Sequence, residues 1–139
     1  MSAARSAHFT CAYTGIGLTP DGGMTWMLPR LVGVRKAQEM LLTNRRIGAS
    51  EAERIGLVTR VVDDESLAEE GAKLASTLAQ SATRALGATR SLILEAFDSS
   101  FDTQLAREAR AISDAGKGRE SIEGISAFFS KRLPNFTGA

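Results

Sequence analysis

The stretch GIGLTPDGGMTWMLPRLVG, residues 15–33, joins a glycine-rich loop to an apolar segment with helical spacing. Its first twelve residues contain four glycines, one proline and a single carboxylate, that of Asp21. Glycines on both sides of this carboxylate would let the backbone come close to a substrate. The segment after the loop has apolar residues at helical spacing and is predicted to be a short or bent helix, because Pro29 lies inside it and Gly33 ends it.

Short strands and helices are predicted around this stretch. Residues 8–13 (HFTCAY) alternate as in a strand, and the β-branched residues 57–62 (LVTRVV) predict a second one. A short helix is predicted from Val34 onward. Residues 50–53 (SEAE) have the pattern of a capping box, in which a serine hydroxyl and a glutamate carboxylate bind each other's backbone N–H groups at a helix start. Gly56 suits the position just past that helix.

The second half of the chain is predicted to be entirely helical. Residues 66–69 (SLAE) repeat the capping-box pattern at the start of the first of four helices. Their apolar periodicity places these helices at about residues 67–80, 82–97, 101–112 and 122–129. Gly71 and Gly87 each cost about 1 kcal/mol relative to alanine inside a helix, which predicts close approach of a neighbouring backbone.

Composition and charge exclude several classes of function. A chain of 139 residues fits one domain, which can bury ~68% of its unfolded surface. Seventeen Lys and Arg balance sixteen Asp and Glu, so neither nucleic acid nor an anionic membrane is an expected partner. Cys11 and His8 are the only residues of their types, too few for an internal disulfide, a structural zinc site or a complete Ser-His-Asp or Cys-His set. We expect no metal.

Two further signals are weak or absent. The glycines at residues 15–17 (GIG) lack the third glycine of a dinucleotide-binding fingerprint, and no lysine follows them to complete a phosphate-binding loop. The first residues, MSAARSAHF, contain no apolar run typical of a signal peptide or membrane span. The expected location is therefore the reducing cytoplasm.

Several motifs together resemble the second half of a crotonase-type, or enoyl-CoA hydratase/isomerase, domain. They occur in the order and at the spacing of that family, and the resemblance covers nearly all of the chain from about Ser6 onward. The motifs are GLTPDGG at residues 17–23, LPRLVG at 28–33, LTNR at 42–45, GLVTRVV at 56–62 and AFFSKRLPNF at 127–136.

The resemblance implies an α/β fold: part of a spiral of ββα units over residues 1–64, followed by a helical region over residues 65–139 that drives trimer formation. The implied enzyme binds an acyl-CoA thioester, needs no separate cofactor, and forms a homotrimer or a dimer of trimers. Two backbone N–H groups that hold the thioester oxygen, and most of the CoA-binding surface, belong upstream of the matched segment. We therefore expect a partial core, arising from a truncated copy, a misplaced start or a half supplied by another chain.

The resemblance also assigns roles to single residues. Hydratases of this family use a glutamate at the position of Tyr13, so the hydratase pair of carboxylates is absent here. Asp21 falls where isomerases of aromatic-ring degradation carry a catalytic aspartate, and where 4-chlorobenzoyl-CoA dehalogenases carry their nucleophile. A carboxylate near an oxyanion-stabilised enolate can take a proton from one carbon and return it to another. An apolar pocket formed by Met24, Trp26 and Met27 would raise the pKa of such a base.

Each candidate also has a purely structural interpretation. Asp21 is equally suited to be the N-cap of the helix that follows it. Tyr13 and Trp26 are candidates for an acyl pocket or for plain core. Lys131, with Arg132, matches a basic patch that in relatives reaches CoA phosphates, often those of the neighbouring subunit, but a cation also suits a helix C-terminus.

The favoured function is an acyl-CoA double-bond isomerase with Asp21 as acid/base. A hydratase ranks second and a dehalogenase third. The alternative from another class is a catalytically inactive crotonase-like module that serves only oligomerisation.

Overall fold

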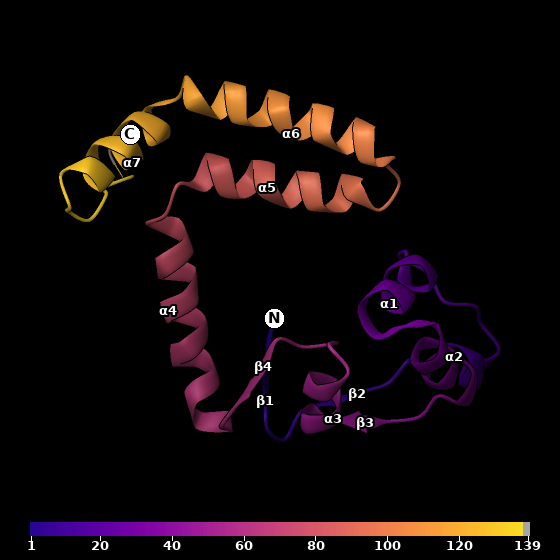
Figure 1. The fold of residues 1–139 in the computed structure, drawn as a ribbon. Coiled ribbons are helices and arrows are strands. Elements are labelled where there is room, and N and C mark those ends of the chain that lie inside the picture. Colours follow the sequence, from indigo (N-terminus) through magenta and orange to yellow (C-terminus); the bar gives the residue numbers. More distant parts are fainter. Residues whose placement is uncertain (138–139) are drawn as a thin grey trace. The chain divides into compact units, whose positions relative to one another are not determined.

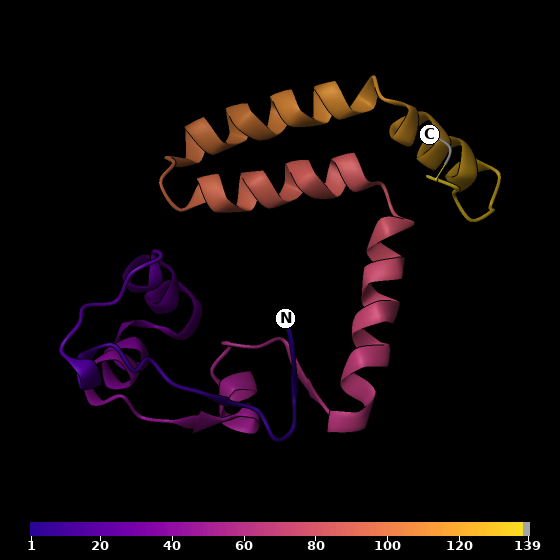
Figure 2. The same ribbon diagram turned by 180° about the vertical axis from the view of Figure 1, so that it is seen from behind.

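The computed structural model describes residues 1–137. The chain divides into two compact units, Met1–Gly71 and Ala72–Ala139. Figures 1 and 2 show the ribbon from opposite sides. The first unit mixes short strands with helices, and the second is helical throughout the part that is described. This division of secondary structure is the one that the sequence predicts.

The first unit contains two small two-stranded sheets. Strand β1 (Ser2–Ala4) pairs in parallel with β4 (Arg60–Val62), with Ala3 opposite Val61. Strand β2 (His8–Phe9) pairs antiparallel with β3 (Ile47–Gly48). Both predicted strands are therefore shorter than expected. The N–H groups of Leu57 and Val58 donate to the carbonyl of Ala52 in a turn, and they are not available for a sheet.

Five helical segments complete the first unit. They are the 3-10 turn η1 (Thr14–Ile16), α1 (Met24–Val32), α2 (Val34–Thr43), α3 (Ala49–Arg54) and the 3-10 turn η2 (Asp64–Ser66). The predicted helices from Met24 and from Val34 are confirmed, including Pro29 within the first of them. Gly33 separates the two with a φ of 80°, a left-handed value that a glycine adopts without strain.

The capping box predicted at residues 50–53 is wrong. Helix α3 begins two residues earlier than that box requires, with Gly48 in place of Ser50 as its N-cap and no side-chain cap. The Glu53 carboxylate accepts the N–H of Val61 at 2.9 Å, so a tertiary partner in β4 replaces the local one. Gly56 does lie just past the helix, with a φ of 81°. A Cβ at this position would come within 3.3 Å of the Leu31 carbonyl oxygen, which is a second reason for glycine.

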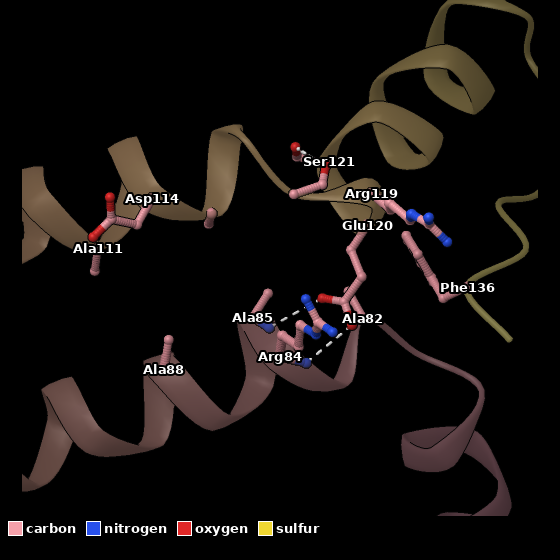
Figure 3. Close-up of a pocket in the computed structure, with 12 residues that line it drawn as sticks. Ala82, Arg84, Ala85, Ala88, Ala111, Asp114, Arg119, Glu120, Ser121 and Phe136 are labelled. Carbon is pink, nitrogen blue, oxygen red and sulfur yellow. Dashed lines mark hydrogen bonds between the residues drawn. The ribbon is translucent and has the colours of Figure 1, made fainter. Parts of the chain in front are cut away.

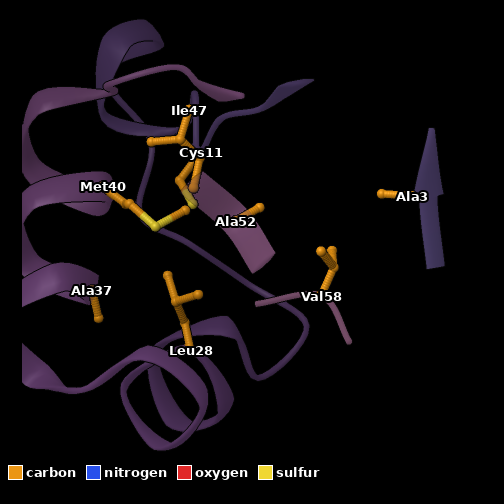
Figure 4. Close-up of a cluster of buried hydrophobic side chains, with 8 residues drawn as sticks. All are labelled: Ala3, Cys11, Leu28, Ala37, Met40, Ile47, Ala52 and Val58. Atoms are coloured by element: carbon orange, nitrogen blue, oxygen red, sulfur yellow. The ribbon is translucent and has the colours of Figure 1, made fainter. Parts of the chain in front are cut away.

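The core of the first unit is a single hydrophobic cluster (Figure 4). Met40 on α2 and Ile47 on β3 are its largest fully buried side chains. The remaining members come from the strands, from the loop after β2, from α1 to α3 and from the turn before β4: Ala3, Cys11, Leu28, Ala37, Ala52 and Val58. The thiol of Cys11 is free, and burial raises its pKa.

Helix α4 (Leu67–Ala79) begins in the first unit and ends in the second, which continues with α5 (Thr83–Ala96), α6 (Phe101–Gly116) and α7 (Arg119–Phe129). All four match the predicted helices within a few residues. Helices α5 and α6 lie side by side and antiparallel in both views. No described atom outside the helix backbone lies within 4 Å of a Cβ built on Gly71 or Gly87, so the predicted close approach of a neighbouring backbone is wrong within this chain.

Candidate functional site

The loop between β2 and α1 is fastened to the C-terminus of α2 by Asn44. This residue ends α2 in the left-handed conformation, with a φ of 52°. Its side-chain Oδ1 accepts hydrogen bonds from the N–H of Gly15 at 3.2 Å and from the hydroxyl of Thr14 at 3.0 Å. Its carbonyl oxygen accepts the hydroxyl of Thr10, and Thr14 also donates to the carbonyl of Leu41. The backbone on both sides of Tyr13 is therefore held against α2.

Tyr13 lies at the start of the tight turn that follows. Its carbonyl oxygen accepts the N–H groups of Ile16 at 3.1 Å and of Leu18 at 3.0 Å. Gly17, with a φ of 76°, reverses the chain between them. The turn brings residues 18–21 back toward the Tyr13 side chain.

The side chains of Tyr13 and Asp21 meet across this turn. The Tyr13 hydroxyl donates a hydrogen bond of 2.8 Å to Oδ1 of Asp21. This hydrogen bond, together with the negative charge of Asp21, raises the pKa of the Tyr13 phenol. Within residues 1–137, no hydrogen bond or ion pair engages the other carboxylate oxygen, Oδ2. Asp21 is exposed and Tyr13 is half-buried.

Asp21 does not cap α1 with its side chain. The N-cap of that helix is Gly23, which has a left-handed φ of 80° and makes no side-chain cap. Only the carbonyl oxygen of Asp21 contributes to the helix start, where it accepts the N–H of Met24 at 3.0 Å. The N-cap interpretation of Asp21 is therefore wrong, and its carboxylate is left for another role.

The sequence predicts an apolar pocket of Met24, Trp26 and Met27 around Asp21. Within residues 1–137, the structure does not show this pocket. Met24 packs against the buried core of the unit, and Asp21 stays exposed. Trp26 is half-buried, and the guanidinium carbon of Arg30 lies 3.8 Å from its ring centroid. Arg30 also donates to the carbonyl of Trp26 at 2.8 Å. Trp26 thus has a cationic partner on its ring face.

Lys131 follows α7 in the second unit, with a left-handed φ of 52° and an exposed side chain. Its ammonium makes no hydrogen bond or ion pair within residues 1–137. The adjacent Arg132 differs, because its two guanidinium Nη atoms form a bidentate ion pair with the carboxylate oxygens of Glu123, at 2.6 and 2.9 Å. Of the two basic residues, only Lys131 keeps its charge unpaired.

A pocket that the sequence did not predict lies between α5, α6 and α7 (Figure 3). It has a volume of about 460 Å³ and a largely alanine wall, with Phe136 and Glu120 at one end. Both carboxylate oxygens of Glu120 accept backbone N–H groups at the start of α5, from Arg84 at 3.0 Å and Ala85 at 3.2 Å, and these bonds lower the pKa of Glu120. The alanines at residues 82, 85 and 88 recur at helical spacing, and this pattern could have indicated a small-residue wall on this face of α5.

Neither a metal centre nor a membrane span is found in the described part of the chain. Residues 1–137 contain no cluster of three or more His, Cys, Asp or Glu side chains placed to hold a metal ion. None of the described helices combines the length and the apolar character needed to cross a bilayer.

The fold and the glycine-rich loop define a crotonase-type chain, and comparison with known proteins agrees. A crystal structure of enoyl-CoA hydratase from Bacillus anthracis superimposes with a TM-score of 0.92 at 33% identity, covering 99% of this chain and 54% of that one. A crystal structure of enoyl-CoA hydratase/isomerase from Cupriavidus metallidurans CH34 gives a TM-score of 0.91 at 35% identity, covering 98% of this chain and 51% of that one.

The sequence matches the enoyl-CoA hydratase/isomerase family over residues 1–139, and the chain belongs to that family. The 1,2-epoxyphenylacetyl-CoA isomerase of Escherichia coli K12 is 42% identical over 136 residues, which are 98% of this chain and 52% of that protein. The chain thus spans about half the length of the curated relatives it matches. The predicted family and its fold class are confirmed.

Proposed function

We propose that this chain supplies the acid/base group of an acyl-CoA double-bond isomerase, and that this group is the carboxylate of Asp21. The observation that carries the proposal is the geometry of Asp21: one oxygen is held by Tyr13, and the other is unengaged and exposed. The Escherichia coli relative is named an isomerase of 1,2-epoxyphenylacetyl-CoA, which supports isomerisation of a CoA thioester in general.

The chemistry needs one carboxylate that can move a proton. A proton next to a thioester carbonyl becomes acidic when N–H donors hold the developing enolate oxygen. Oδ2 of Asp21 would take this proton from one carbon and return it to another, so the carboxylate is regenerated at the end of the cycle. The resemblance assigns the N–H donors to the half of the relatives that this chain does not match.

A hydratase is the second candidate, and its support is weaker. Relatives named hydratases include the crotonyl-CoA hydratase of Syntrophomonas wolfei, at 37% identity. The position that resembles the second hydratase glutamate is Tyr13, whose phenol is a much weaker acid than a carboxylic acid and cannot replace it as a base at neutral pH. A dehalogenase ranks third.

The proposed substrate is a CoA thioester, and no separate cofactor is required. Trp26 and Tyr13 would contact the acyl group. The unpaired ammonium of Lys131 would contact a CoA phosphate, often that of a neighbouring subunit, as the resemblance implies. We propose a homo-oligomer, a trimer or a dimer of trimers, in the cytoplasm, without nucleic acid or membrane partners. The alternative is an inactive module of the same fold that serves only assembly.

Calorimetry of the purified 139-residue chain with a 3-enoyl-CoA, followed by an isomerase assay, tests the proposal. We expect saturable binding by the chain. In an active assembly that also supplies the N–H donors, we expect Asp21→Asn to reduce kcat by about 100-fold or more. Asp98→Asn is the matched control, because its carboxylate is exposed and makes no contact in the described chain. Unchanged turnover in Asp21→Asn would rule out its acid/base role, and a folded chain that binds no thioester would favour the inactive module.

A further inference from the structure

We propose that Tyr13 is the positioning residue of Asp21: its hydroxyl fixes Oδ1 and thereby aims Oδ2 as the oxygen that exchanges protons with substrate. The inference rests on the acid/base role proposed for Asp21. This role differs from the substrate contact proposed above. The phenol hydroxyl would bind Asp21, so only the tyrosine ring could contact an acyl chain.

The backbone around Tyr13 is held by hydrogen bonds on both its carbonyl side and the side of α2. Asn44 binds the N–H of Gly15 and the hydroxyl of Thr14, immediately after Tyr13. The Tyr13 carbonyl accepts two further N–H groups within the turn, from Ile16 and Leu18. The backbone that carries the phenol is therefore hydrogen-bonded both within the turn and to Asn44 at the end of α2.

The Asp21 backbone is held at one point, where its carbonyl accepts the N–H of Met24, but its side chain has no partner besides Tyr13 among the described residues. Asp21 lies between Pro20 and two glycines, and Gly22 and Gly23 both have left-handed φ values, 58° and 80°. Its side chain is exposed and makes one hydrogen bond within the described residues, the 2.8 Å bond from Tyr13. The orientation of the carboxylate thus depends on the phenol, because no other hydrogen bond or ion pair within residues 1–137 restrains it.

A phenol is a neutral donor at neutral pH, so it restrains the carboxylate without neutralising its charge. Because each oxygen of a carboxylate is an acceptor, engaging Oδ1 leaves Oδ2 for the substrate proton. A base held in one orientation stays near the reacting carbon, and misplacement by about 1 Å can cost about 100-fold in rate.

The chain offers a direct spectroscopic test, because Tyr13 is its only tyrosine. The phenolate absorbance of the purified chain, followed as pH rises, reports this one group. The hydrogen bond to Asp21 raises the pKa of Tyr13, so Asp21→Asn should shift the phenol titration to lower pH. Asp98→Asn should leave it in place. Coincident titrations of wild type and Asp21→Asn would overturn the proposal.

The kinetic test is Tyr13→Phe, which keeps the ring and removes only the hydroxyl. We expect kcat to fall by about 10–100-fold with little change in KM. An unchanged kcat would overturn the positioning role. A raised KM with an unchanged kcat would instead indicate that the Tyr13 hydroxyl contributes to substrate binding.

The two proposals can fail separately. Normal turnover in Asp21→Asn would contradict the acid/base role, whereas a defect in Asp21→Asn without one in Tyr13→Phe would contradict only the positioning role. If the chain shows no turnover, the phenol titration alone decides whether Tyr13 holds Asp21.

Discussion

Among the described carboxylates, Glu123 on α7 has its pKa lowered by an ion pair and a backbone hydrogen bond that form only in the folded chain. Both guanidinium nitrogens of Arg132 donate to its carboxylate, and the N–H of Asn135 adds a third bond at 2.7 Å. The ion pair with Arg132, followed by the bond from Asn135, lowers the pKa of Glu123 from 4.5 to about 2. The pair closes the segment after α7 back onto that helix.

A carboxylate whose folded pKa is lowered stabilises the fold above its unfolded pKa. That stabilisation is lost progressively as pH falls from about 4.5 toward 2. We therefore predict that Glu123→Gln lowers the melting temperature at neutral pH and removes part of the acid sensitivity between these two pH values. Thermal unfolding followed by circular dichroism across this range measures both effects.

Glu108→Gln is the matched control for this prediction. Glu108 makes a single weak contact, with the amide of Gln104 at 3.5 Å, so its replacement should change the melting temperature little at any pH. Equal acid sensitivity in wild type and Glu123→Gln would contradict the proposed link between Glu123 protonation and folding.

The hydrogen bond between Tyr13 and Asp21 is a second feature at the residue scale. It could not be predicted from sequence, because it depends on how the turn at Gly17 reverses the chain.

At the scale of elements, the helices were predictable, whereas of the described strands only β2 and β4 were predicted, both too long, and β1 and β3 were missed. The helices have strong apolar periodicity, and α4 to α7 begin and end close to where that pattern does. The strands depend on pairing: β4 needs β1 from 58 residues earlier, and only three residues of each take part. The capping pattern at residues 50–53 failed for the same reason, because Glu53 binds the distant N–H of Val61. Local patterns fail here where long-range hydrogen bonds compete.

Helix α2 shows how one face of an element carries the stability of its unit. Met40 is 1% exposed and packs in the core, whereas Leu42, two residues on, is 70% exposed. Met40→Ala should destabilise the first unit by about 2–5 kcal/mol, because it removes buried apolar surface and leaves a cavity. Leu42→Ala should change stability by less than about 0.5 kcal/mol. Urea unfolding of both variants tests the prediction, and similar losses would show that Leu42 is covered in solution.

At the scale of the whole molecule, the two units bury apolar side chains very unequally. The first unit has the buried cluster around Met40 and Ile47, whereas among the described residues of the second unit only Ala127 belongs to the buried hydrophobic set. Large apolar side chains on α5 to α7, and that of Phe97 just after α5, are exposed: Ile93, Phe97, Phe101, Leu105, Ile112, Ile122, Ile125, Phe128 and Phe129. Exposed apolar surface of this extent marks an interaction surface in a folded protein.

The proposed homo-oligomer predicts that these side chains are covered by other copies of the chain. Multi-angle light scattering should then give a mass several times the 14.8 kDa of one chain, three times for a trimer. Ile112 is 75% exposed on α6, and Ile112→Glu should lower the mass, because burying an unpaired charge in an apolar contact is unfavourable. Ser113→Glu adds the same charge at the next position of α6, which is also exposed and polar already, and should leave the mass unchanged. A monomeric wild-type chain would contradict self-assembly and would indicate that a different partner covers the apolar faces of α5 to α7. An assembly that dissociates only in Ile112→Glu would place the subunit contact on α6.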